Sequence, residues 1–267
     1  DIALRVGRVM NYGDGIYGGQ FVGGMYSAAF FETDPEKIVL EGLKCIPADS
    51  QYAECMRDVI AWWKENPNDW EATWKLIEAK YNENLDYRKF SCGGKKKTFN
   101  IDAKINGAYI AIGLLYGKGD PDKTIVISCR CGQDSDCNPS NAAGVLGCMK
   151  GFESMGSEIT SGIEAIRNEK FIHTDYGFDS LIDACRGITE QIIARTGGTV
   201  DGSVYHILRQ PAQPPVTLEQ WVNQEEMLKI AITPTEMRLW DPAWRVVACG
   251  HEMEPGIRRG WHGRDSV

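Results

Sequence analysis

Residues 102–120 read DAKINGAYIAIGLLYGKGD, and this stretch decides the fold. Large apolar side chains recur at every third or fourth position between Asp102 and Tyr116, with Ala and Gly between them. A helix that is apolar all round is buried among other elements. The stretch therefore predicts a buried helix.

Helical patterns continue on both sides of this stretch, and several have clear start signals. The run Thr33-Asp34-Pro35 is typical of a capped helix start with proline in the first turn, and Gly117–Pro121 ends one helix and caps the next. The apolar run 125–127 is also compatible with a strand, but its helical neighbours favour a helix. The periodicity predicts helices over 15–31, 35–45, 49–65, 69–81, 121–131, 158–168, 178–195 and 217–229, and a surface loop over 82–100.

The composition changes beyond residue 209, which predicts the domain organisation. Residues 210–215 read QPAQPP, typical of a connector, and short strand-like apolar segments follow residue 232. We predict an all-α, compact multi-helix domain over 1–209. A connector and helix follow over 210–231, and the start of a short β-rich C-terminal module over 232–267.

The bulk composition excludes some classes of partner. A formal net charge of -8 argues against a nucleic acid or an anionic membrane surface. No window approaches the roughly 20 consecutive apolar residues of a membrane span. Nine cysteines are an odd number without framework spacing, so we expect reduced, buried thiols and a cytoplasmic protein. A zinc cluster is the alternative for four of them, Cys129, Cys131, Cys137 and Cys148, although their spacing matches no known zinc motif.

Two acidic residues are spaced one residue apart in the stretch 132–139, GQDSDCNP. Asp134 and Asp136 can converge on one point in a turn, where each negative charge raises the pKa of the other unless a cation intervenes. A hard divalent cation, which prefers oxygen ligands, suits such a pair. The alternative is a helix N-cap with a solvated second acid. An EF-hand is excluded, because Pro139 and Val145 stand where that loop needs Gly and Glu.

Three segments together resemble one known family. They are 106–120 (NGAYIAIGLLYGKGD), 132–138 (GQDSDCN) with the small-residue helix after it, and the glycine-rich stretch 13–26. In order and content these residues closely resemble the ADP-ribosylglycohydrolase family, over roughly residues 8–155. The resemblance implies an all-α hydrolase with a binuclear Mg²⁺ site in a cleft that binds ADP-ribose, with Mn²⁺ or Ca²⁺ as possible replacements. Its substrate would be an ADP-ribosylated protein or a small-molecule ADP-riboside.

The resemblance also assigns the acidic turn. Asp134 and Asp136 match metal ligands of the family and carry the catalytic role, with Asp136 as the bridging ligand. Cys137 stands at the position of a threonine ligand. A thiol is a soft donor and a poor partner for Mg²⁺, so water or a carbonyl oxygen can take its coordination place.

Substrate-binding residues are expected at two places. Asp14, Gly15 and Tyr17 lie at a predicted helix start, where backbone N–H groups favour a pyrophosphate, although glycines there also serve helix packing. Asn106 either lines the cleft or caps a helix.

One part of the family pattern is missing from these residues. The family's N-terminal Thr-Asp-Asp-Thr type motif, which supplies further metal ligands, does not occur in the chain. We therefore expect the C-terminal portion of a longer protein, with a degenerate homologue that binds metal poorly as the alternative. Three classes stay open: a metal-dependent hydrolase, a non-catalytic nucleotide- or sugar-binding protein, and a purely structural helical domain.

Overall fold

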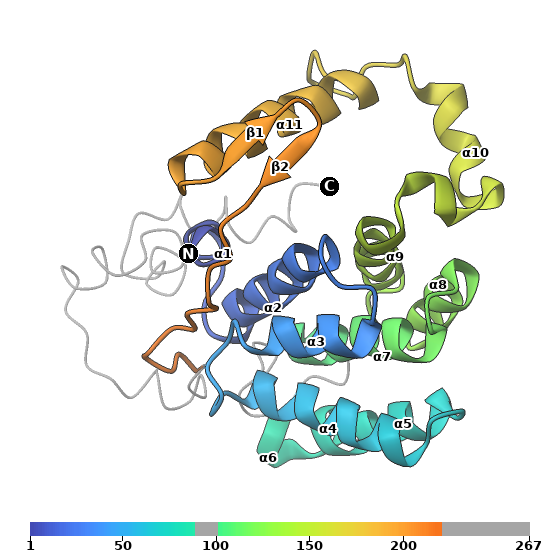
Figure 1. Cartoon of the computed structure of the whole chain (residues 1–267). Coiled ribbons are helices and arrows are strands. Elements are labelled where there is room, and N and C mark those ends of the chain that lie inside the picture. Colours follow the sequence, from blue (N-terminus) through green and yellow to red (C-terminus); the bar gives the residue numbers. More distant parts are fainter. Residues whose placement is uncertain (89–100, 221–267) are drawn as a thin grey trace, which may run out of the picture. The chain divides into compact units, whose positions relative to one another are not determined.

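The computed structural model of the protein describes residues 1–88 and 101–220, which lie in one compact unit of the chain, Asp1–Trp221 (Figure 1). Helices dominate this described part, and one small antiparallel hairpin accompanies them, so the all-α prediction is confirmed. The elements are α1 (Ile2–Gly7), α2 (Asp14–Ala29), α3 (Pro35–Leu43), α4 (Gln51–Glu65), α5 (Trp70–Ile77), the π-helix η1 (Glu78–Glu83), α6 (Leu85–Arg88), α7 (Ala103–Gly117), α8 (Pro121–Arg130), α9 (Cys137–Lys150), the 3₁₀-helix η2 (Phe152–Met155), α10 (Ser157–Ile166), α11 (Phe178–Arg195), β1 (Thr199–Asp201) and β2 (Val204–His206).

Helix α7 is buried, as its sequence predicts, and the structure places it at the centre of the core. Every residue from Lys104 to Gly117 is buried, and the helix contacts α2, α3, α4, α5, α8 and α9. Full burial of one large aliphatic side chain stabilises a fold by about 1.5–3 kcal/mol. The apolar residues of α7 therefore make it the element around which the others pack.

The predicted start and stop signals act as expected around α7. The Asp102 carboxylate caps the helix by accepting a hydrogen bond from the Lys104 N–H at 3.0 Å. The helix ends at Gly117, and Lys118 takes the left-handed conformation with φ of 52°. Asp120 then caps α8 by accepting from the Lys123 N–H at 3.1 Å, and Pro121 opens the helix. The strand alternative for 125–127 is excluded, because these residues lie within α8.

Helix α5 is shorter than predicted, and the chain continues as the π-helix η1. The wider π turn brings two consecutive residues to the same partner, since Lys80 Nζ lies 2.6 Å and Tyr81 Oη 2.7 Å from Asp58 Oδ2. Such π turns are rare and local. Of the loop predicted over 82–100, residues 82–88 lie largely in η1 and α6, and 89–100 lie outside the described residues.

The hairpin β1–β2 lies inside the segment predicted to be helical, which corrects that part of the prediction. Asp201 pairs with Val204 across a two-residue turn in which Gly202 has φ of 59°. The Gly-Ser pair in this turn, between two runs that carry β-branched and aromatic residues, is a hairpin signal. Of the helix predicted over 217–229, residues 217–220 are not helical, and the rest lies outside the described residues, as does the β-rich module predicted at 232–267.

The seven cysteines in the described ranges are all free thiols. Only Cys55 and Cys131 are buried, whereas Cys129, Cys137 and Cys185 are exposed. The prediction of buried thiols therefore holds for two of the seven, whereas Cys45 and Cys148 are half-buried and the other three are exposed. No helix in the described ranges is long and apolar enough to span a bilayer.

Candidate metal centre

The acidic turn connects α8 to α9, and its N-terminal side has a left-handed backbone. Gly132 has φ of 93° and Gln133 has φ of 55°. This conformation is open to glycine but costs a residue with a side chain about 1–2 kcal/mol. After the turn, the Asp134 carbonyl accepts from the Asn138 N–H at 3.0 Å, and Asp136 caps α9 by accepting from the Cys137 N–H at 3.0 Å. The chain thus reverses tightly just before a helix N-terminus.

The three predicted metal ligands are brought together in this turn. One donor atom each from Asp134, Asp136 and Cys137 lies within 4.8 Å of the others. Asp134 is half-buried, and the other two side chains are exposed. Two carboxylates suit a hard cation such as Mg²⁺, whereas a thiol suits softer ions. The set can therefore hold a divalent cation, with the thiol as the weaker partner for Mg²⁺.

Hydrogen bonds around the turn shift the pKa values of Asp136 and Cys137 in opposite directions. A hydrogen bond with the Asp134 carboxyl, and after it backbone N–H groups including that of Cys137, lowers the pKa of Asp136. The sequence predicts that each carboxylate raises the pKa of the other unless a cation intervenes, but the pKa of Asp136 is lowered, because these hydrogen bonds stabilise its ionised form. A hydrogen bond with Asp134 and its negative charge raise the pKa of the Cys137 thiol.

The other predicted site residues lie at the starts of α2 and α7. Asp14 Oδ2 is 3.4 Å from Lys104 Nζ, and Tyr17 is 1% exposed. A Cβ added at Gly15 would lie 2.9 Å from Asn11 Oδ1, so a glycine suits this position. Asn106 is 7% exposed, and its amide contacts residues on both sides of the acidic turn.

A carboxylate from a distant part of the chain lies at the start of α2. Glu219 forms an ion pair with Arg8, and its Oε2 accepts from the Gly13 N–H at 3.5 Å. The Glu219 N–H donates to Tyr17 Oη at 2.6 Å. The N-terminus of α2 therefore accommodates an anionic group.

The first turn of α7 joins the two predicted site regions. Lys104 binds Asp14 at the start of α2, and Asn106, two residues later, binds the acidic turn. Sequence reasoning missed the contributions of Lys104, Asn138 and Glu219. A lysine inside an otherwise apolar helix was a usable signal, because a buried charge needs a partner.

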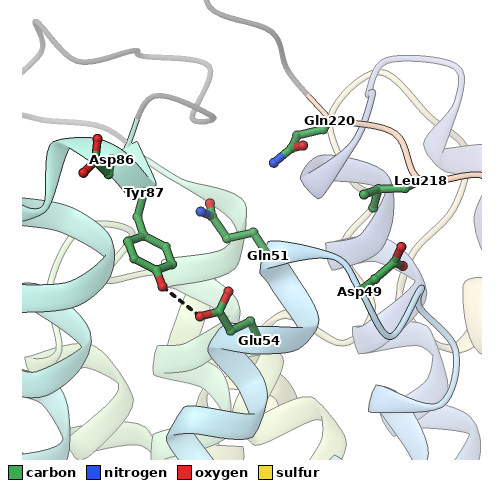
Figure 2. A pocket seen from close by; sticks show the side chains of 7 residues that line it. All are labelled: Asp49, Gln51, Glu54, Asp86, Tyr87, Leu218 and Gln220. Carbon is green, nitrogen blue, oxygen red and sulfur yellow. Dashed lines mark hydrogen bonds between the residues drawn. The ribbon is translucent and has the colours of Figure 1, made fainter.

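A pocket elsewhere in the described part has a different lining. Figure 2 shows the hydrogen bond across it, in which Tyr87 Oη donates to Glu54 Oε1 at 2.9 Å. None of the residues with a predicted role lines this space, so it is separate from the candidate metal centre. The pocket has a volume of about 360 Å³ and is lined by Asp49, Gln51, Glu54, Asp86, Tyr87, Leu218 and Gln220.

Comparison with known proteins agrees with this geometry. The family model described as ADP-ribosylglycohydrolase matches residues 1–193, which include the acidic turn and all of the elements that contact α7. The chain belongs to the ADP-ribosylglycohydrolase family. Searches of curated proteins and of solved structures find no match to this chain.

Membership supports a hydrolase of the ADP-ribosylglycohydrolase family. The family is generally metal-dependent, and the acidic cluster at 134–137 is a candidate site for the metal. Family substrates are ADP-ribosylated molecules.

Proposed function

We propose that this protein hydrolyses the glycosidic bond between ADP-ribose and a protein side chain or small molecule, in a reaction that depends on a divalent metal. The observation that supports the proposal is the cluster of Asp134, Asp136 and Cys137 in a chain of this family. The cluster lies just before the N-terminus of α9, in a turn with a left-handed entry.

The donor set fits Mg²⁺ through its carboxylates. Asp134 and Asp136 provide oxygen donors from adjacent positions, and Mg²⁺ or Mn²⁺ is bound through one or two carboxylates with the remaining positions left to water. When bound, such an ion orients ribose hydroxyls and lowers the pKa of a coordinated water. The two carboxylates of Asp134 and Asp136 would be its ligands.

The chemistry of the bond explains why carboxylates are needed there. Glycosidic cleavage passes through a transition state with positive charge on the anomeric carbon. Asp134 and Asp136 concentrate negative charge on a short turn, and donors lower the pKa of Asp136, so that group is ionised at neutral pH. Their negative charge would stabilise the positive charge that develops on the anomeric carbon, and neither group is assigned the proton transfer.

The start of α2 is the proposed position for the pyrophosphate of ADP-ribose, with Asp14, Gly15 and Tyr17 around it. Glu219 already places a carboxylate against the Gly13 N–H, which supports the idea that an anion fits this place. A phosphate group at the same position would displace Glu219.

The test compares Asp136→Asn with Asp120→Asn in the protein expressed from its natural gene. Both aspartates cap a helix through a carboxylate oxygen that an asparagine retains, but Asp120 caps α8 and lies outside the cluster. Asp136→Asn is expected to lower Mg²⁺-dependent release of ADP-ribose from a modified peptide by more than about 100-fold, since even second-shell changes at metal sites cost 10–100-fold. Asp120→Asn is expected to keep the wild-type rate.

Two results would contradict the proposal. Release that continues in excess chelator would exclude the metal mechanism, and so would a fully active Asp136→Asn variant. Tight binding of ADP-ribose by the wild type without any release of it from peptide or small-molecule conjugates would favour the non-catalytic binding protein.

A further inference from the structure

The side-chain amide of Asn106 is the most completely bonded polar group next to the acidic turn. Its Nδ2 donates to the Asp102 carbonyl at 2.9 Å and to Gln133 Oε1 at 3.0 Å. Its Oδ1 accepts from the Asp134 N–H at 3.2 Å and from Asn138 Nδ2 at 2.7 Å. An asparagine amide has two hydrogens and two lone pairs. All four are therefore used within the protein.

The orientation of this amide follows from its two backbone partners. The Asp134 N–H can only donate and the Asp102 carbonyl can only accept, so the oxygen of Asn106 must face Asp134 and its nitrogen must face Asp102. With that orientation set, Asn138 must donate and Gln133 must accept. One unique hydrogen-bond pattern thus connects α7, the turn and α9.

The partners of Asn106 lie on both sides of the candidate ligands. Gln133 precedes Asp134 and has the left-handed backbone, and its side chain is held by Asn106. Asn138 follows Cys137, is 2% exposed, and also donates to the Gly132 carbonyl at 3.5 Å. The buried Asn106 side chain of α7 therefore forms hydrogen bonds with Gln133 before the first candidate ligand, with the backbone of that ligand, Asp134, and with Asn138 after the last one.

We propose that Asn106 is a positioning residue that holds the Asp134–Cys137 turn in the conformation that binds a divalent cation; this inference rests on the proposed function above. A free turn would let the two carboxylates move apart, because like charges repel. Holding the backbone on both sides keeps them close before the cation arrives, as outer-shell partners do at metal sites. A contact with ADP-ribose would require Asn106 to break one of its four hydrogen bonds.

The test measures Mn²⁺ binding by electron paramagnetic resonance in the protein expressed from its natural gene. Asn106→Ala is expected to weaken Mn²⁺ binding by about 10–100-fold, and Asn138→Ala to weaken it in the same direction. Because the two amides share a hydrogen bond, the double variant should lose less than the product of the two single losses. Asn66→Ala is the matched control: it also removes a side-chain donor to the carbonyl four residues earlier, but it lies at the end of α4.

Kinetics at saturating Mn²⁺ distinguish positioning from substrate contact. With the metal site filled, Asn106→Ala should recover kcat and keep the wild-type KM for an ADP-ribosylated peptide. A KM that stays high at every Mn²⁺ concentration would instead assign Asn106 to the substrate and overturn the inference.

The remaining outcomes separate this inference from the proposed function. If the wild type binds Mn²⁺ and Asn106→Ala binds it equally well, the positioning role is wrong while the metal site stands. If the wild type binds no Mn²⁺, the proposed metal site is wrong, and the positioning role of Asn106 is then wrong as well. Should Asn106→Ala fail to fold, Gln133→Ala carries the test, because it removes a single bond from the pattern and must weaken Mn²⁺ binding if the inference is right.

Discussion

Gly107 of α7 faces the hydroxyl group of Tyr52 on α4 so closely that a Cβ at position 107 would lie 1.9 Å from that oxygen. Tyr52 is 0% exposed and packs against Phe21 with 5.6 Å between ring centroids, so its ring has no free space to move into. Its hydroxyl has no hydrogen-bond partner among the described residues. The close contact between α4 and α7 therefore requires a residue without a side chain at position 107.

Gly107→Ala is expected to destabilise the protein by about 2 kcal/mol or more in urea unfolding, because overpacking outweighs the gain in helix propensity. Tyr52→Phe removes the unpartnered hydroxyl and should stabilise the protein by up to about 1 kcal/mol. The double variant should regain part of the loss, since the ring carbon Cζ would still lie 2.7 Å from the new Cβ. Gly162→Ala is the control: no atom lies near its Cβ position in α10, and it should stabilise slightly. An unchanged Gly107→Ala variant would contradict this packing.

The buried ammonium of Lys104 gives a second prediction. Its Nζ lies 2.7 Å from Asp102 Oδ2 and 3.4 Å from Asp14 Oδ2. Burial lowers the pKa of Lys104, but the two carboxylates outweigh burial and raise it overall. Lys104→Met takes a cation away from buried carboxylates and should cost about 3–5 kcal/mol of unfolding free energy. The exposed pair of Lys123 and Asp120 is the control, and Lys123→Met should cost under about 1 kcal/mol.

The pH dependence of the stability lost in Lys104→Met follows from the direction in which the pKa of Lys104 is shifted. A lysine whose pKa is raised in the folded state contributes fully below its unfolded value of 10.5, and the contribution is lost only as the pH rises through the higher folded value. The difference between wild type and Lys104→Met should therefore stay constant from pH 6 to pH 9. A difference that shrinks across this range would show that Lys104 is neutral in the folded protein.

Most of the fold was predictable because its signals are local. The buried helix α7 follows from a run with apolar residues on every side, and α3 and α8 follow from an aspartate before a proline. The π-helix η1 was not predictable, because it depends on the contact of Lys80 and Tyr81 with Asp58, more than 20 residues away in sequence. The hairpin at 199–206 had a local Gly-Ser turn signal, but its strands are only three residues long.

The candidate site likewise has some features that could be predicted from local sequence and others that could not. Asp134, Asp136 and Cys137 are neighbours in the chain, so their clustering could be predicted from spacing alone. The bonding of Asn106 to Gln133 and of Tyr17 to Glu219 spans 27 and 202 residues, and depends on which helix faces which. No periodicity in a single chain contains that information. This is why Asn106 looked equally compatible with a cleft and a cap.

Acid sensitivity should arise in part from Glu54 of α4. Burial raises the pKa of Glu54, but hydrogen bonds from Lys80 and Tyr87 outweigh burial and lower it overall. A carboxylate with a lowered pKa stabilises the fold above its unfolded value of 4.5, and that contribution is lost as the pH falls through the folded value. Glu54→Gln should therefore unfold more easily than wild type at pH 7, by less than about 1 kcal/mol because the side chain is 37% exposed.

Urea unfolding at pH 7 and pH 3.5 checks this prediction. The difference between wild type and Glu54→Gln should shrink at the lower pH, because Glu54 takes up a proton as the pH falls through its lowered folded pKa. In a Lys80→Met background most of the difference at pH 7 should disappear, since the ammonium lies 2.8 Å from Glu54 Oε1. An equal difference at both pH values would mean that the charge of Glu54 contributes nothing.

The thiol of Cys137 should decide which cations the candidate metal centre prefers. It lies with the carboxylates of Asp134 and Asp136, and soft thiolates select ions such as Zn²⁺ and Cd²⁺ over Mg²⁺. Cys137→Ser is expected to weaken Cd²⁺ binding more than tenfold in calorimetry and to remove the ultraviolet absorption of a cadmium–thiolate bond, while Mg²⁺ binding changes by less than about threefold. Cys129→Ser, which changes an exposed thiol outside the cluster, should leave both ions unaffected. If wild-type protein saturated with Cd²⁺ shows no thiolate absorption, Cys137 is not a ligand, and the cluster binds cations through Asp134 and Asp136 without the thiol.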